Sequence, residues 1–267
     1  GVGRCRVRMG KHAEAAELFD KLLQQGVSED LSARIHYELA TISEAEGDTY
    51  EALNHYKSVL RSPGGPDKGE VFLHVGGLYF RTRIYKEAGE AFQNALPLVH
   101  TEADSIAALR GAITALTMEG KLRAADGRRK EFKERYGDRK EEMADIVYHE
   151  GLHFLVVKKY DKAVKRFRYV LEKYGETDWV DDAAYQMGLS HYYDNEKDKA
   201  LALFGNFVKQ YPQSEYVPVA NFKIAMIYHE NEDFARAAEV FARVSRNERA
   251  DGKTRFRAAS NAAVDYQ

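Results

Sequence analysis

The chain has 267 residues, of which 44% are hydrophobic and 31% charged, and its formal net charge is −2. This composition excludes a disordered tail, and the near-neutral charge argues against a general nucleic-acid binder. No apolar run approaches the length of a membrane span, so we expect no membrane insertion. The single cysteine rules out an intramolecular disulfide, and only five prolines favour a helical chain.

One short pattern recurs along the chain: an alanine, a residue four positions later that is usually aromatic, and an apolar residue three further on. This spacing places the three side chains on one face of a helix. Consecutive copies are 36 to 38 residues apart, which predicts a helical repeat. The marker alanines are Ala15, Ala52, Ala88, Ala125, Ala163, Ala200 and Ala237, with the copy at Ala125 the weakest.

A second helix is predicted before each marked one. A glycine or alanine stands twelve residues ahead of most marker alanines, as at Gly76, Gly151 and Gly188. A small residue there lets the neighbouring helix approach closely. Short polar turns, such as residues 46–48 and 231–233, separate the two helices and suit antiparallel pairs. Each repeat is therefore predicted to be a helical hairpin.

These positions resemble the tetratricopeptide repeat family across essentially the whole chain. The resemblance implies an all-α fold, a right-handed α-solenoid of about six to seven hairpins, with residues 1–267 as one solenoid. The period is nearer 37 than the family's usual 34. The fourth repeat also departs from the pattern, because Arg129 replaces the aromatic residue and Ile113 the packing glycine. We expect looser packing in the basic segment 120–135.

The repeat phase also predicts truncation within a repeat at both ends. Gly3 already occupies the packing-glycine position of the first repeat, and residues 258–262 fit the first helix of an eighth. The chain is therefore expected to be a piece of a longer protein.

Several repeats close with a tyrosine followed by glycine or proline, at Tyr136, Tyr174 and Tyr211. This stop is similar to the long-period repeats of bacterial cell-envelope proteins, mainly over residues 144–245. Those proteins include outer-membrane assembly lipoproteins, the periplasmic coiled-coil partner of the Tol–Pal system and the helical region of soluble lytic transglycosylases. The resemblance favours a periplasmic or cell-envelope location over a cytoplasmic one.

One motif suggests catalysis. The residues from His149 to His153 read H-E-x-x-H, a spacing that puts two imidazoles on one helix face, where they could bind zinc with Glu150 as base. The repeat explains the same residues, because Gly151 falls on the packing-glycine position. No further motif supplies a third ligand. We therefore predict no enzyme, no catalytic residue, no metal and no cofactor, and keep a zinc hydrolase as an alternative.

The family lines its concave face with first-helix residues, and the resemblance carries this role to particular positions here. The lysine and asparagine of the family's carboxylate clamp are absent, so we expect an extended or helical protein segment as partner. Two interpretations of the aromatic members remain open: they bind a ligand, or they only fill the groove. The predicted lining residues are Arg34, Tyr37, Arg110, Tyr148, Asp182, Tyr185, Tyr192 and Phe222.

The sequence thus predicts a non-catalytic protein–protein interaction scaffold that binds a peptide or protein segment in its groove, within a bacterial envelope assembly. The alternative is the helical, non-catalytic region of a larger cell-wall enzyme of the lytic transglycosylase kind. The oligomeric state and the partner's identity are not predicted.

Overall fold

The computed structural model describes residues 2–265, which form fifteen α-helices and no strand. The all-α prediction is confirmed. None of the described helices combines the length and the apolar character that crossing a bilayer requires. The chain divides into two compact units, the first ending at Tyr136 and the second beginning at Gly137, and each is described by itself. The prediction of one solenoid, truncated within a repeat at both ends, stays a prediction.

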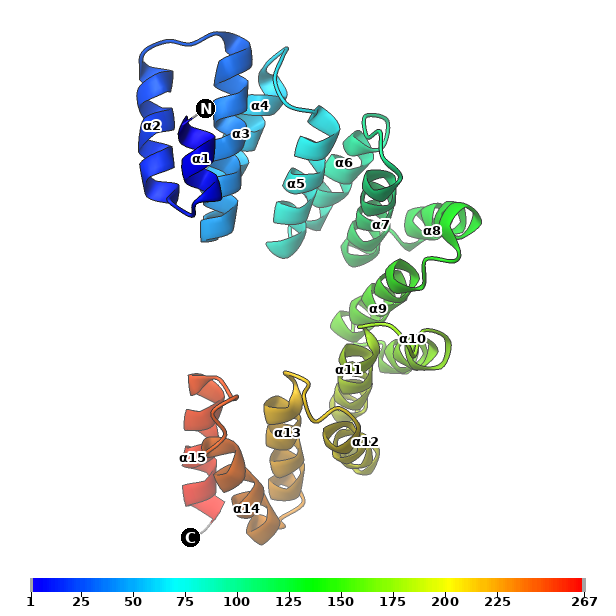
Figure 1. Cartoon of the computed structure of the whole chain (residues 1–267). Helices are drawn as coiled ribbons and strands as arrows, with labels where there is room; N and C mark the ends of the chain where they lie inside the picture. The colour runs from blue at the N-terminus through cyan, green and yellow to red at the C-terminus, as the bar shows by residue number, and fades with distance from the viewer. Residues whose placement is uncertain (1, 266–267) are drawn as a thin grey trace. The chain divides into compact units, whose positions relative to one another are not determined.

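Unit 1 is a row of helices in which each packs against the next in the chain (Figure 1). The odd-numbered helices are the first helices of the repeats, and the even-numbered ones are the second helices. Its helices are α1 (Val2–Arg8), α2 (His12–Gln24), α3 (Glu29–Glu46), α4 (Thr49–Arg61), α5 (Lys68–Arg81), α6 (Tyr85–Ala95), α7 (Glu102–Glu119) and α8 (Leu122–Tyr136).

Unit 2 follows the same order, and each of its helices again packs against its chain neighbour. Its helices are α9 (Lys140–Val156), α10 (Tyr160–Lys173), α11 (Val180–Tyr193), α12 (Lys197–Gln210), α13 (Val217–Glu230), α14 (Phe234–Ser245) and α15 (Gly252–Asp265). All seven marker alanines lie on even-numbered helices and are buried.

In several hairpins a glycine of the first helix packs against a phenylalanine ring of the second. A Cβ added at Gly151 would lie 2.5 Å from the ring of Phe167, and one at Gly188 would lie 2.8 Å from Phe204. Both rings are fully buried. The small residue is therefore required because the aromatic ring occupies the space of its side chain, as the repeat spacing predicted.

Most hairpin turns contain one residue in the left-handed backbone region. Gly47 and Gly120 adopt it at the turns before α4 and α8, with φ of 82° and 88°. Arg83, Lys158 and Glu232 do so at equivalent turns, with φ of 63°, 59° and 61°. This conformation closes the helix tightly and lets the next helix reverse direction.

The fourth repeat is the irregular one. Its second helix, α8, buries Ala125, Phe132 and Tyr136 alone among its residues. Arg129, which stands in the aromatic position, pairs with Asp126 on the same helix instead of entering the core. The boundary between the two units follows directly after this helix.

Candidate binding face

All eight predicted lining residues lie on first helices, as expected from the repeat phase. They belong to two units, so they form two separate sets. Arg34 and Tyr37 are on α3 and Arg110 is on α7, in unit 1; Tyr148 is on α9, Asp182, Tyr185 and Tyr192 are on α11, and Phe222 is on α13, in unit 2.

In unit 1, Tyr37 is part of a polar cluster that joins neighbouring repeats. Its hydroxyl donates to Glu70 Oε1 at 2.6 Å, from the first helix of the next repeat. Burial and this hydrogen bond raise the pKa of the Tyr37 hydroxyl. Beside it, Glu44 accepts from Tyr56 at 3.0 Å and from Arg81 at 2.9 Å. The cluster holds one repeat against the next.

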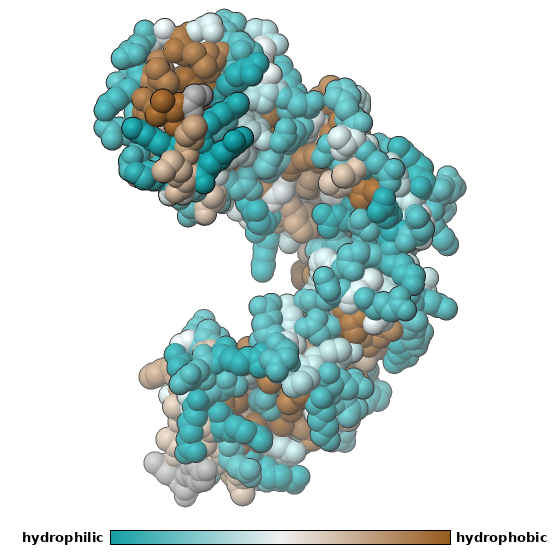
Figure 2. Space-filling model, viewed as in Figure 1, coloured by the Kyte–Doolittle hydropathy of each residue, from teal (hydrophilic) through white to brown (hydrophobic). Residues whose placement is uncertain are grey.

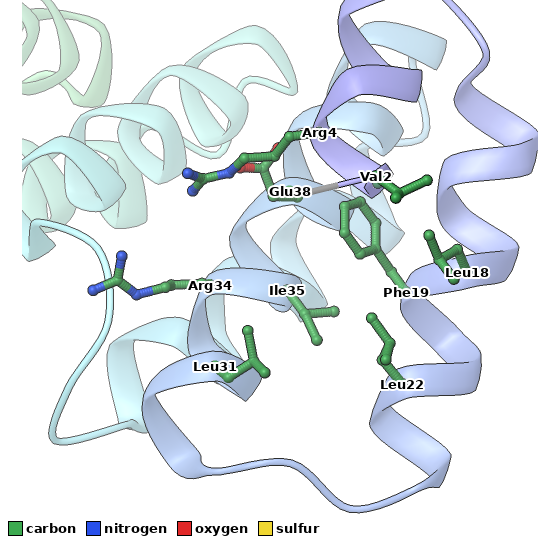
Figure 3. Close-up of a pocket in the computed structure, with 10 residues that line it drawn as sticks. Val2, Arg4, Leu18, Phe19, Leu22, Leu31, Arg34, Ile35 and Glu38 are labelled. Carbon is green, nitrogen blue, oxygen red and sulfur yellow. The ribbon is translucent and has the colours of Figure 1, made fainter.

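Arg34 lies beside an apolar pocket of about 430 Å³ at the N-terminal end of unit 1. Figure 3 shows Phe19, Leu31 and Ile35 around the pocket, with the guanidinium of Arg34 pointing away from them. Figure 2 shows the same region as an apolar patch over α1, α2 and α3. Arg34 pairs with Asp30 at 2.9 Å, one turn earlier on its own helix. Arg110 is half-buried on α7.

In unit 2, the predicted aromatic row is mostly core. Tyr148, Tyr185 and Phe222 are only 5%, 8% and 8% exposed. Tyr185 stacks on Tyr216 with ring centroids 4.6 Å apart, and burial raises the pKa of Tyr185 to about 12. Phe222 meets Phe241 edge to face at 5.3 Å. These rings fill the space between helices, which is the second of the two interpretations left open by the sequence.

Asp182 links three successive repeats of unit 2. Its Oδ1 accepts from the Tyr216 hydroxyl at 2.8 Å and lies 3.4 Å from the Tyr148 hydroxyl. Burial raises the pKa of the Asp182 carboxyl, although the bond from Tyr216 opposes this shift. Asp182 therefore accepts hydrogen bonds from both neighbouring repeats and orients two aromatic side chains.

Tyr192 belongs to a more accessible cluster at the end of α11. Its hydroxyl donates to Glu230 at 2.8 Å, and Lys223 places its Nζ 4.3 Å from the Tyr192 ring centroid and 5.4 Å from that of Tyr193. Tyr193 is 51% exposed. Burial lowers the pKa of the Lys223 ammonium, while Glu230 acts in the opposite direction. We call Tyr192, Tyr193 and Lys223 the tyrosine–lysine cluster.

Of this cluster, Tyr192 is among the predicted lining residues, whereas Lys223 is not. Lys223 follows the predicted Phe222 on α13, the first helix of the repeat after α11. Its side chain contacts Tyr192 across the boundary between these two repeats. The Tyr192–Tyr193 doublet was the sequence signal, since two successive aromatics on a helix cannot both face its core.

The residues from His149 to His153 are held by structural contacts. His149 Nδ1 lies 2.7 Å from Asp145 Oδ1, and Glu150 pairs with Arg166 at 2.8 Å. Gly151 abuts the Phe167 ring. Within residues 2–265 no group of three His, Cys, Asp or Glu side chains is placed to hold a metal ion. The repeat alone accounts for this motif.

Two family models match the chain. Residues 3–53 match a tetratricopeptide repeat family, and residues 139–263 match the YfiO family, described as outer membrane lipoprotein. The second match covers most of unit 2. No curated protein matches the sequence.

Solved structures show the same fold. The apo form of RapI aligns with a TM-score of 0.60 at 12% identity, over 95% of this chain and 80% of that one. Yeast Tom70 aligns with a TM-score of 0.58 at 16% identity, over 96% of this chain and 59% of the Tom70 chain. A tetratricopeptide repeat protein from Parabacteroides merdae aligns with a TM-score of 0.53 at 18% identity, over 88% of this chain and 91% of that one. Residues 3–53 thus match a tetratricopeptide repeat family, and the solved structures show that the chain has the helical fold of tetratricopeptide repeat proteins.

Proposed function

We propose that this chain is a non-catalytic scaffold of a bacterial envelope assembly, and that the tyrosine–lysine cluster of unit 2 binds a segment of a partner protein. Tetratricopeptide repeat proteins generally bind protein or peptide partners. The observation that carries the proposal is the half-exposed Tyr193 on first helix α11 beside the cation of Lys223.

The contacts around the cluster suit recognition. Tyr192 is fixed by its hydrogen bond to Glu230, and Glu230 also pairs with Lys197 at 3.1 Å. A fixed aromatic ring loses little conformational freedom when a partner docks, so its contact area contributes more of its gross energy to binding. The cluster therefore offers a rigid aromatic surface with a polar margin.

The envelope assignment rests on the match of residues 139–263 to an outer membrane lipoprotein family. The cluster lies within this matched region. The tyrosine stops noted in the sequence lie at or near the same region, at Tyr136, Tyr174 and Tyr211. These features support an envelope partner over a cytoplasmic one.

Site-specific photo-crosslinking in the source cells tests the proposal. A photoreactive residue at position 193 should capture a defined partner. The same photoreactive residue at position 169 is the control, since Tyr169 is similarly exposed, at 42%. It should capture no partner, because it lies on α10, a second helix of the same unit.

The captured partner then provides a quantitative test. Tyr193→Ala and Lys223→Ala should each weaken its affinity by about tenfold, since aromatic and charged anchors at interface centres commonly carry that much. Tyr169→Ala should leave the affinity within about twofold. Equal crosslinking from both positions, or unchanged affinity in both cluster variants, would exclude this face as the binding site.

A further inference from the structure

Two histidines of unit 1 lie in direct contact across the second hairpin. His36 is on α3 and His55 on α4, and their Nδ1 atoms are 3.0 Å apart. The ring centroids are 5.2 Å apart, with the ring planes inclined by 34°. Both side chains are partly buried, so solvent and small ions still reach the pair. The repeat phase and the scaffold function leave this pair unused.

The separation of the two nitrogens fits joint coordination of a metal ion. Two imidazole nitrogens on a tetrahedral zinc ion, each about 2.0–2.1 Å from it, lie about 3.3–3.4 Å apart. Adjacent nitrogens on a square-planar copper(II) or nickel(II) ion lie about 2.8–2.9 Å apart at similar bond lengths. The observed 3.0 Å falls between these values. A small rotation of either ring would open the pair to accept an ion.

We propose that His36 and His55 form a two-histidine chelate for a divalent transition-metal ion, copper(II) above nickel(II) and zinc(II). Among first-row divalent ions copper(II) binds nitrogen ligands most strongly. No third His, Cys, Asp or Glu side chain completes a cluster in the part of the chain that the structure describes. Water or an external ligand occupies the remaining positions, so the site is open.

Two acidic side chains, Asp20 and Glu51, favour positive charge at the pair. Burial lowers the pKa of His36, and His55 lowers it further. Burial also lowers the pKa of His55. The negative charge of Asp20 raises the pKa of both histidines, and that of Glu51 raises the pKa of His55. The same charges favour a positive ion at the pair.

Metal titration of the chelator-treated protein without an affinity tag tests the proposal. Copper(II), nickel(II) and zinc(II) are each titrated alone by calorimetry, and copper(II) is also followed by electron paramagnetic resonance. We expect nitrogen hyperfine coupling in the copper spectrum and a higher melting temperature for the metal-loaded protein. Copper(II) should bind more tightly than the other two ions.

Variants assign the binding to this pair. His36→Gln and His55→Gln should each weaken copper(II) binding by at least about tenfold. The double variant gives the background from the rest of the chain. His100→Gln is the control, because His100 has a 79% exposed side chain and should leave the affinity unchanged. Leucine at the same position, which carries no ligand atom, replaces a glutamine variant that fails the circular-dichroism check of folding.

Either of two results would overturn the proposal. One is copper(II) binding of equal affinity in the wild type and the folded double variant. The other is a wild type that shows no nitrogen coupling and no rise in melting temperature, which would leave the pair as a hydrogen bond between neutral imidazoles.

Discussion

The repeat formed by α7 and α8 and the repeat formed by α9 and α10 follow each other in sequence but differ in how they are held together. In α10 a fully buried phenylalanine fits against a glycine of α9. In α8 the aromatic position carries an arginine paired on its own helix. The equivalent positions are Ile113 and Gly151, Arg129 and Phe167, and Arg110 and Tyr148.

The fourth repeat forms its hairpin without the glycine–aromatic contact. Helix α7 buries ten residues, whereas α8 buries three. Gly111 on α7 also abuts the ring of Phe92, from the preceding repeat. Thus α7 is anchored to the preceding repeat, whereas α8 enters the core through Ala125, Phe132 and Tyr136.

Removing the aromatic ring at the regular repeat should have the largest effect. Phe167→Ala deletes a fully buried ring and should lower the free energy of unfolding by about 3–5 kcal/mol. Urea denaturation followed by tryptophan fluorescence measures this loss of stability within unit 2. Trp179 is the single tryptophan of the chain, and its ring centroid lies 4.9 Å from that of Tyr148.

The matched change at the irregular repeat is Arg129→Ala, followed by circular dichroism. It should cost less than about 1 kcal/mol, because its ion pair with Asp126 is partly exposed and such pairs contribute little. Comparable losses from both substitutions would mean that Arg129 stabilises α8 as much as Phe167 stabilises α10, contrary to the difference in burial of the two side chains.

Adding a single methyl group should change the free energy of unfolding in opposite directions in the two repeats. Gly151→Ala places a Cβ 2.5 Å from the Phe167 ring and should destabilise by about 1–3 kcal/mol through overpacking. Gly127→Ala, on α8, meets no atom within 4 Å and should stabilise by about 0.5–1 kcal/mol by favouring the helix. Thermal melts by circular dichroism measure both. A stabilising Gly151→Ala would show that the glycine–aromatic contact is loose.

The smallest expected effect concerns Asp182, which lies on α11 and contacts the hydroxyl of Tyr148 on α9. Burial raises the pKa of Asp182 in the folded chain. Its contribution to stability is therefore complete below the unfolded pKa of about 3.9 and is lost as the pH rises through the folded value.

Asp182→Asn tests this because it keeps an oxygen that accepts from Tyr216 but cannot ionise. We expect the wild type to lose stability relative to this variant as the pH rises from about 3 towards neutrality. Urea midpoints across that range, read by Trp179 fluorescence, give the difference. A difference that grows in favour of the wild type would mean that the charged carboxylate is stabilised in the fold.

The candidate site was predicted less completely than the repeats. The phase placed Tyr148, Tyr185 and Phe222 on first helices, but it did not show that their rings are buried. A family's lining position specifies a helix face, whereas burial depends on how far the next repeat covers that face. Lys223 was missed because its contact with Tyr192 joins residues that are far apart in the sequence.

The sequence by itself determined the helical repeat, its phase and its irregular member, because alanine, glycine and aromatic spacings express local packing within a hairpin. Only the tertiary structure decided which aromatic side chains form core and which stay accessible, and that His36 meets His55. Those outcomes depend on distances between separate helices. They are set by the packing of whole side-chain layers, which residue spacing along one helix does not encode.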